Sequence, residues 1–436
     1  MNGAKRSEGL GIFAAVAFAV GNMIGAGVFV LSGIMIDLAG PSAVLSYLVC
    51  GVLVAFSGLS YAALASIFPE DGGGYLYARH MLGEYLGFLA GWSMYISQIV
   101  VTSFVLLGLG IYLNLLLGSN FDPRFGALAG IILLTALNLR GLSEAGKAEI
   151  VMVVTKVSIL VVLAIFGMMQ IKSADFVPFF VHGQKGVLEG MASIFFAYLG
   201  FQVVAMMGGE VKEASKNVPL ATMASIGIVA AIYTGVVVAL LSAKLPSYGS
   251  QSVFDAAVVL LGASGGAIVA FAAVVSTLSA ANANIIGASR VVLEMASEGQ
   301  VPGRFARLKR DQPANSIVLG SATTMLLVVY GSLNFIIDLT NVLVLITMFF
   351  VNVSAFKLVR EERILPPEKS YFRIPMGGLF PAIGAVSCLL MLSAISPTTL
   401  GMGLFALLLG SILHHLEDTP GGRRTVEEIR ELLGRG

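Results

Sequence analysis

Long runs of apolar residues alternate with short polar segments along the whole chain. Most runs reach the roughly 20 residues that a helix needs to cross ~30 Å of hydrocarbon. Because lipid offers no hydrogen-bond partner to the backbone, such runs must form helices, and the short alternating segments of a membrane β-barrel are absent. The pattern predicts twelve membrane-spanning helices, at residues 10–36, 41–67, 85–116, 125–140, 148–170, 187–210, 219–243, 264–294, 314–332, 336–356, 376–394 and 398–415.

The composition is that of a membrane protein. Hydrophobic residues make up 57% of the 436 residues and charged residues only 12%, whereas soluble domains are roughly 25% charged. This argues against a soluble enzyme, a nucleic-acid-binding protein or a disordered chain, and the net charge of +1 suggests no polyanionic partner. The two cysteines, Cys50 and Cys388, lie in apolar runs, so we expect no disulfide framework, no metal site and no cofactor.

The distribution of basic residues predicts the orientation. Lys5 and Arg6 place the N-terminus in the cytoplasm, and an even number of spans places the C-terminus there too. The first run is too long for a signal peptide. We therefore expect a multi-pass protein of the cell (inner) membrane. Of the 26 Lys and Arg residues, those in predicted outer loops are Arg124, Lys172, Lys185 and Lys244.

Two spans carry interruptions at matching positions. Span 1 contains Gly21, Gly25 and Gly27, each of which weakens a helix by roughly 1 kcal/mol relative to alanine. Span 6 contains the stretch 195–202, which includes Gly200. Paired interruptions in two five-helix halves are typical of a transporter site. The free N–H end of a half-helix attracts a carboxylate and freed carbonyls bind an ammonium group, so the breaks suit a zwitterion. The alternative is that these glycines only allow close helix packing.

Lys156 is the one ionisable residue well inside a span, ~12 Å from its cytoplasmic end at 1.5 Å per residue. The span cores offer no Asp or Glu as a partner, so the ammonium must bind carbonyls and hydroxyls or lose its proton. We therefore expect a proton-coupling group that bridges the break in span 1 to Ser276, Thr277 or Ser279 in span 8. The alternative is a lysine that extends to the membrane surface as an anchor.

These motifs resemble the amino acid transporters of the amino acid–polyamine–organocation superfamily. The resemblance covers the chain to about residue 415 and is nearest to the prokaryotic broad-specificity, proton-coupled, sodium-independent members. The stretches that carry it are 21–29 (GNMIGAGVF), 68–77 (FPEDGGGYLY), 196–201 (FAYLGF) with Glu210 to Lys212 and Pro219, 279–284 (SAANAN), 287–290 (GASR) and 299–302 (GQVP).

The resemblance implies an all-α sodium-symporter-like fold. Residues 1–415 would form one transporter domain, with inverted five-helix repeats at about 10–170 and 187–356 and two extra helices in 376–415. Beyond the resemblance, residues 416–436 are expected to form a cytoplasmic amphipathic tail, because Val426, Ile429, Leu432 and Leu433 lie at helical spacing among charges; the alternative is a frayed, solvated tail.

The resemblance also implies the roles of individual residues. The substrate carboxylate would meet the N–H groups of Gly25, Ala26 and Gly27. The amino group would meet carbonyls of Met23, Phe196, Ala197 or Leu199 beside Gly200, with Phe196 and Tyr198 as aromatic gates. Lys156 would take the place of the sodium ion of sodium-coupled relatives, bound by the Gly21 and Ile24 carbonyls and Ser279, with Ser276 and Thr277 as second choices.

The sequence thus predicts a proton symporter of amino acids. No charged residue lies at mid-depth near spans 1, 3, 6, 8 or 10, so small-to-medium neutral amino acids fit best. The family often has an acid where this chain has Gln202, which leaves Lys156 as the coupling residue. An exchanger, a sodium symporter and a non-transporting nutrient sensor stay open as alternatives, as does the oligomeric state. The spans hold no paired carboxylates or nucleophile–base set for a membrane-embedded enzyme, so we expect none. The expected partners are the amino acid, protons and membrane lipid.

Overall fold

The computed structural model describes residues 10–418, apart from positions 71, 141–144, 182, 207, 310–311, 362–371 and 394. Within these residues the protein is helical and has no strand, only isolated backbone bridges between Leu10 and Val211 and between Lys309 and Gln312. The last helix extends to Asp418. The amphipathic helix predicted in the tail beyond it lies outside the described residues.

Every range predicted as a span contains a helix. The helical segments of the first half of the chain are α1 (Ile12–Met23), η1 (Gly27–Leu31), α2 (Ser32–Ala39), η2 (Gly40–Ser42), α3 (Ala43–Ile67), α4 (Gly74–Leu82), α5 (Glu84–Leu117), α6 (Pro123–Arg140), α7 (Ala145–Gln170) and η3 (Ser173–Phe176). In the second half they are α8 (Gly183–Ala197), α9 (Gln202–Met206), η4 (Gly208–Glu210), α10 (Ala214–Ala243), α11 (Ser252–Ser297), η5 (Gly303–Ala306), α12 (Ala314–Tyr330), α13 (Leu333–Arg360), α14 (Leu379–Ser393) and α15 (Pro397–Asp418).

Seven helical stretches in the described part of the chain are long and apolar enough to cross a membrane, and the first of them, Ile12–Ile67, contains both α1 and α3. Two further apolar helices, Ala314–Tyr330 and Leu379–Ser393, are shorter. This supports an all-helical, multi-pass membrane protein. The count of twelve spans and the inverted repeat stay predictions.

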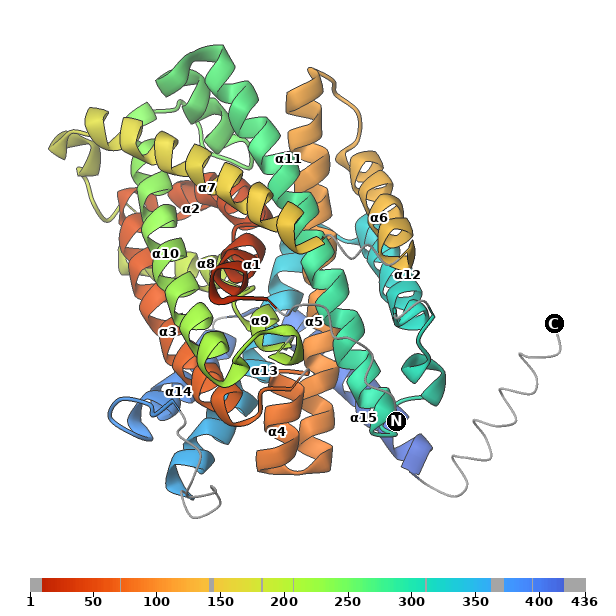
Figure 1. Ribbon diagram of the computed structural model, residues 1–436. Coiled ribbons are helices and arrows are strands. Elements are labelled where there is room, and N and C mark those ends of the chain that lie inside the picture. Colours follow the sequence, from red (N-terminus) through yellow and green to blue (C-terminus); the bar gives the residue numbers. More distant parts are fainter. Residues whose placement is uncertain are drawn as a thin grey trace.

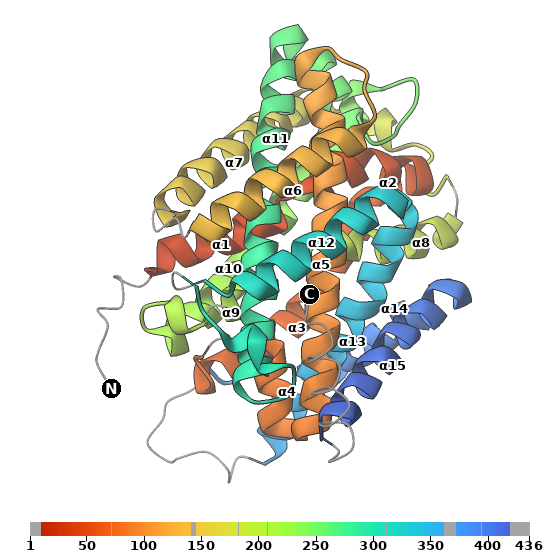
Figure 2. The ribbon, with the colours of Figure 1, turned by 90° about the vertical axis from the view of Figure 1, so that its right-hand side faces the viewer.

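The interrupted helices lie at the centre of the molecule. Helices α1, α2, α8 and α9 are surrounded by α3 packed against α10 on one side and by α5 packed against α11 on the other (Figure 1). Helix α7 crosses α1 obliquely and contacts both α10 and α11. Helices α6 and α12 contact each other, and α14 and α15 lie on the outside against α13 (Figure 2). The two breaks are thus enclosed by continuous helices.

Two helical segments were not predicted. The nine-residue α4 carries polar and charged residues, and α11 begins at Ser252, before the apolar run from 264. Gly262 interrupts α11 with a φ of +79°, a conformation open to glycine, so the first turns are a separate arm. Hydropathy finds lipid-crossing segments and misses helices that lie partly outside them.

Small residues bring neighbouring helices close together. A Cβ atom added at Gly167 of α7 would lie 2.2 Å from the Cα atom of Ala239 on α10, so only glycine permits this approach. Such contacts supply packing where lipid gives no hydrophobic force between helices. The contact between α7 and α10 matters because α7 carries Lys156.

An ion pair holds the loop after α7 to the end of α10. Lys244 Nζ lies 2.7 Å from Asp175 Oδ1, and Asp175 Oδ2 also accepts a hydrogen bond of 2.8 Å from the Lys172 N–H. The Lys244 side chain, and then the Lys172 N–H, lower the pKa of the Asp175 carboxyl below its usual range. Lys244 is 62% exposed, so solvent screens the pair and its contribution to stability is small.

We predict that Asp175→Asn lowers the melting temperature modestly at pH 7. Because the folded pKa of Asp175 is depressed, its stabilising contribution is present above the unfolded pKa of about 3.9 and is lost as pH falls through the folded pKa. The difference in melting temperature between wild type and Asp175→Asn should therefore shrink below about pH 4. Melting curves in detergent from pH 7 to pH 3 test this, with the half-exposed Asp122→Asn as the control. A constant difference across that range would contradict the assignment.

Candidate functional site

The first break follows Met23. Ile24 leaves the helical region with φ −80° and ψ 67°, and the Gly25 N–H turns back to the Met23 carbonyl at 2.9 Å. The chain becomes helical again in the π-helical turn η1, which continues into α2. Ala26 and Gly27 therefore lie at the start of the second half-helix, where backbone N–H groups have no partner within the helix.

The second break follows Ala197. Residues 198–201 form a turn, in which Gly200 has a φ of +127°, before α9 begins at Gln202. The Gln202 side-chain oxygen accepts a 2.9 Å hydrogen bond from the Gly200 N–H. Gln202 thus binds one of the backbone groups freed by the break.

The two breaks contact each other directly. Asn22 Nδ2 donates to the Gly200 carbonyl at 3.3 Å. A Cβ atom at Gly200 would lie 2.7 Å from the Met23 backbone nitrogen, and one at Gly27 would lie 3.1 Å from the Ala197 Cα atom. These glycines are therefore required at the contact between the breaks, which includes the packing role left open in the sequence analysis.

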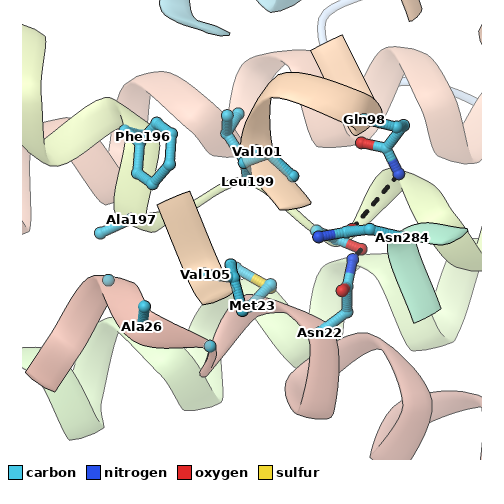
Figure 3. A pocket seen from close by; sticks show the side chains of 13 residues that line it. Asn22, Met23, Ala26, Gln98, Val101, Val105, Phe196, Ala197, Leu199 and Asn284 are labelled. Atoms are coloured by element: carbon cyan, nitrogen blue, oxygen red, sulfur yellow. Dashed lines mark hydrogen bonds between the residues drawn. The ribbon is translucent and has the colours of Figure 1, made fainter. Parts of the chain in front are cut away.

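A small cavity lies between the breaks (Figure 3). Its lining consists of Asn22, Met23, Gly25, Ala26, Gly27, Gln98, Val101, Val105, Phe196, Ala197, Leu199, Gly200 and Asn284. All eight residues expected to bind substrate are in this lining, although their roles stay predictions. No lining residue carries a charge. The cavity suits a small neutral or zwitterionic molecule that can bind free backbone groups.

Figure 3 shows that the cavity has two unlike ends. Phe196, Ala197 and Ala26 lie at one end, and the carboxamides of Asn22, Gln98 and Asn284 lie at the other. The Phe196 ring packs edge-on against Phe104, with ring centroids 4.5 Å apart. Phe196 therefore borders the cavity, as its expected gate role requires.

Tyr198, the second expected gate, is not brought to the cavity. Its hydroxyl donates to the Tyr47 carbonyl at 2.9 Å, and its ring packs against Tyr47 and Tyr233 with centroids 6.5 and 5.4 Å apart. It is fully buried in this aromatic cluster. The geometry gives Tyr198 a packing role rather than a position where it could close the cavity.

Lys156 lies directly beneath the first break. Its fully buried ammonium lies 2.6 Å from the Gly21 carbonyl oxygen, 2.9 Å from that of Ile24 and 3.5 Å from Ser279 Oγ. These are the groups that the resemblance implied. The side chain thus links α7, α1 and α11 and does not extend to the surface as a simple anchor would.

The two second-choice hydroxyls are arranged differently. Ser276 donates to the Ile24 carbonyl, which also accepts from the Lys156 ammonium, so Ser276 contacts the break. Thr277 bonds to the Ala273 and Val274 carbonyls of its own helix. The structure brings Ser276 to the site and leaves Thr277 outside it.

Tyr233 of α10 joins both breaks, and the sequence reasoning missed it. Its hydroxyl lies 2.6 Å from the Met23 carbonyl oxygen and 2.9 Å from that of Ala197, so one proton is shared between two acceptors. Both carbonyls had been assigned to the substrate amino group. Nothing in its sequence context marks Tyr233, because a tyrosine in an apolar span usually packs.

Gln98, Asn284, Val101 and Val105 were also missed. Gln98 gave a usable signal, since a carboxamide within an otherwise apolar span is costly to bury without a partner. Asn284 was part of a motif, but the sequence did not indicate that it faces the cavity. The valines gave none, because apolar residues fill every span.

We predict that Gly200→Ala destabilises the protein by more than the about 1–3 kcal/mol that strain at such a φ costs by itself. The added methyl group meets the backbone of the other break, which cannot move as a flexible side chain could. The melting temperature in detergent measures the effect. Gly227→Ala on α10 is the control, because no atom lies within 4 Å of its added Cβ. Equal melting temperatures for the two variants would refute the proposed contact.

We predict that Tyr233→Phe lowers stability by about 1–3 kcal/mol, since two buried carbonyls lose a donor. Tyr95→Phe is the matched control, because the buried Tyr95 hydroxyl has no hydrogen-bond partner among the described residues. Thermal unfolding of both variants under the same conditions provides the comparison. A loss in Tyr95→Phe as large as that in Tyr233→Phe would show that the hydroxyl bonds to the breaks contribute nothing specific.

Comparison with known proteins agrees with this geometry. Residues 10–405 match the family described as amino acid permease. A methylthioribose transporter of Bacillus subtilis (strain 168) is 28% identical over 404 residues, which covers 87% of each chain. A branched-chain amino acid permease of the same strain is 25% identical over 93% of this chain and 92% of its own length. A serine/threonine exchanger, also from this strain, is 29% identical over 69% of this chain and 70% of its own. The chain therefore belongs to the amino acid permease family.

Proposed function

We propose that this protein is a secondary active transporter that takes up small-to-medium neutral L-amino acids with protons, by alternating access to the cavity between the two breaks. The observation that carries the proposal is the cavity itself. It is lined by backbone of both interrupted helices and by no charged residue. A molecule with a carboxylate, an ammonium group and an uncharged side chain fits these surroundings.

The substrate backbone would bind at the end formed by Ala26, Ala197 and Phe196. The N–H groups at the start of the second half-helix carry the positive end of its dipole, which favours a carboxylate. The Ala197 carbonyl, which Tyr233 already orients, has a second lone pair and can accept from an ammonium group, whereas the Met23 carbonyl already accepts from Tyr233 and from the Gly25 N–H. Phe196 would cover the bound molecule.

Lys156 would couple substrate binding to a proton. Its ammonium lies on the same peptide segment that borders the cavity, where two carbonyls and a hydroxyl accept from it. When Lys156 loses its proton, the Gly21 and Ile24 carbonyls lose a charged donor, and the first break is less constrained. The location in the cell membrane, with cytoplasmic termini, is part of this proposal.

An amino acid exchanger is the second candidate. It is favoured by the similarity to the serine/threonine exchanger. Uptake by an exchanger depends on amino acid inside the vesicle and not on a pH gradient. The same vesicles therefore distinguish the two mechanisms.

We predict that Lys156→Met abolishes the acceleration of uptake by an inwardly directed proton gradient. Proteoliposomes at pH 7.5 inside and 6.0 outside, given a panel of labelled neutral amino acids, measure it, and wild type should show at least about tenfold faster uptake of its substrate than without the gradient. Thr155→Val is the control, because Thr155 bonds only within α7. Gradient-driven uptake in the folded Lys156→Met variant would contradict proton coupling through Lys156. Dependence on sodium, or on internal amino acid alone, would favour the other mechanisms.

A further inference from the structure

The three carboxamides at the far end of the cavity form what we call the amide end, made of Asn22, Gln98 and Asn284. They come from α1, α5 and α11, and all are buried, with exposed fractions of 6%, 3% and 4%. Gln98 Nε2 donates to Asn284 Oδ1 at 3.4 Å, as Figure 3 shows. Buried amides in a membrane protein are costly unless each polar atom has a partner. Their convergence on a cavity therefore points to a ligand.

Asn22 has an unused acceptor. Its Nδ2 group donates to the Gly200 carbonyl, and only the NH₂ side of an amide can do so, which fixes the orientation of the side chain. Its Oδ1 atom is buried and has no hydrogen-bond partner among the described residues. Asn22 lines the cavity, so a molecule bound there can supply the missing donor.

The part of the substrate that reaches the amide end follows from the proposed function, on which this inference rests. The carboxylate and ammonium groups would bind near Ala26 and Ala197, at the opposite end of the cavity. The side chain must then extend past Val101 and Leu199 towards the amide end. The atoms that meet Asn22, Gln98 and Asn284 would belong to the substrate side chain.

We infer that the amide end selects substrates with an uncharged hydrogen-bonding side chain, namely hydroxyl or carboxamide amino acids, over aliphatic ones of the same size. A hydroxyl or an amide NH₂ donates to Asn22 Oδ1 and also offers an oxygen to a neighbouring amide. An aliphatic side chain would leave these groups without partners. A carboxylate or ammonium side chain would be buried without a counter-ion, because the cavity has no charged lining residue.

Threonine and valine provide the sharpest comparison, because they have nearly the same shape and differ in a hydroxyl. A site built to hydrogen-bond a hydroxyl rejects the analogue without it far more strongly than an apolar pocket rejects the added hydroxyl. We expect wild type to bind threonine at least about tenfold more tightly than valine. Asparagine should likewise be preferred to aspartate.

The test uses the purified full-length protein and measures Kd for threonine and valine by isothermal titration, with uptake of both in proteoliposomes. Variants Gln98→Leu and Asn284→Leu keep the volume while removing hydrogen bonds. Leucine is chosen at position 98 because Gln98 also lines a second small cavity, and a short residue would join the two. Asn284→Ser provides a second variant in case the leucine variant does not fold.

Asn138→Leu is the matched control. Asn138 Nδ2 donates to Asn282 Oδ1 at 2.7 Å, so it also joins a carboxamide to α11, but neither residue lines the cavity. The expected result is a fall in the threonine-to-valine preference of at least about tenfold in the Gln98 and Asn284 variants and no change in Asn138→Leu. The ratio of the Kd values for threonine and valine is measured within each variant, so a general loss of stability does not change it.

Two results would overturn the inference while leaving the proposed function intact: equal binding of threonine and valine by wild type, or a preference that the Gln98 and Asn284 variants retain. The variant Asn22→Ala can give a third such result. If it weakens both amino acids equally, Asn22 Oδ1 binds the ammonium group and not the side chain, and its assignment here is wrong. By contrast, a folded wild type that neither binds nor moves any neutral amino acid would refute the proposed function.

Discussion

The structure depends on one constraint, namely that every backbone polar group exposed by a helix break inside a membrane must find a partner within the protein. Two helices are broken side by side, and the freed groups are satisfied by the side chains around them. Asn22 and Gln202 bind the two sides of the Gly200 residue, its carbonyl and its N–H. Tyr233 binds one carbonyl from each break. In the proposed function, the N–H groups at the start of the second half-helix, which have no partner within that helix, would recognise the backbone of an amino acid.

The same constraint explains how backbone carbonyls bind a buried cation. An ammonium group in the interior needs several acceptors, and the end of α1 offers carbonyls that α1 itself no longer uses. Lys156 therefore supplies a donor to the carbonyls freed by the break, and these carbonyls supply acceptors to its buried ammonium group. In the proposed mechanism, this contact is where a change in the protonation state of Lys156 would reach the break.

The sequence predicted the parts of the site that are marked by residue types unusual in an apolar span. It did not predict the parts that depend on which way a side chain points. Glycines and an isolated lysine stand out in apolar spans, so the breaks and the carbonyl partners of Lys156 could be anticipated, the latter through resemblance. Tyr198 and Tyr233 are both tyrosines in apolar spans, yet one is confined to an aromatic cluster and the other holds both breaks. The direction of a side chain depends on how its helix is rotated about its own axis. A span that is apolar on all faces does not indicate this rotation in its sequence. The arm at the start of α11 was missed because hydropathy detects burial in lipid and not helicity.

The Ile24–Gly25 peptide offers a physical link between proton and substrate in the proposed mechanism. Its carbonyl faces Lys156 and Ser276, while Gly25 lines the cavity. A trans peptide is planar, so the carbonyl and the following N–H point in opposite directions and must turn together. A change at Lys156 that turns the carbonyl therefore also turns the Gly25 N–H, which would have to leave the Met23 carbonyl to meet the carboxylate. Because coupling between two binding sites is reciprocal, an amino acid that fixes this peptide must strengthen proton binding at Lys156 by the same factor. Coupling then needs no path through the protein, since both ligands act on the two ends of one peptide group.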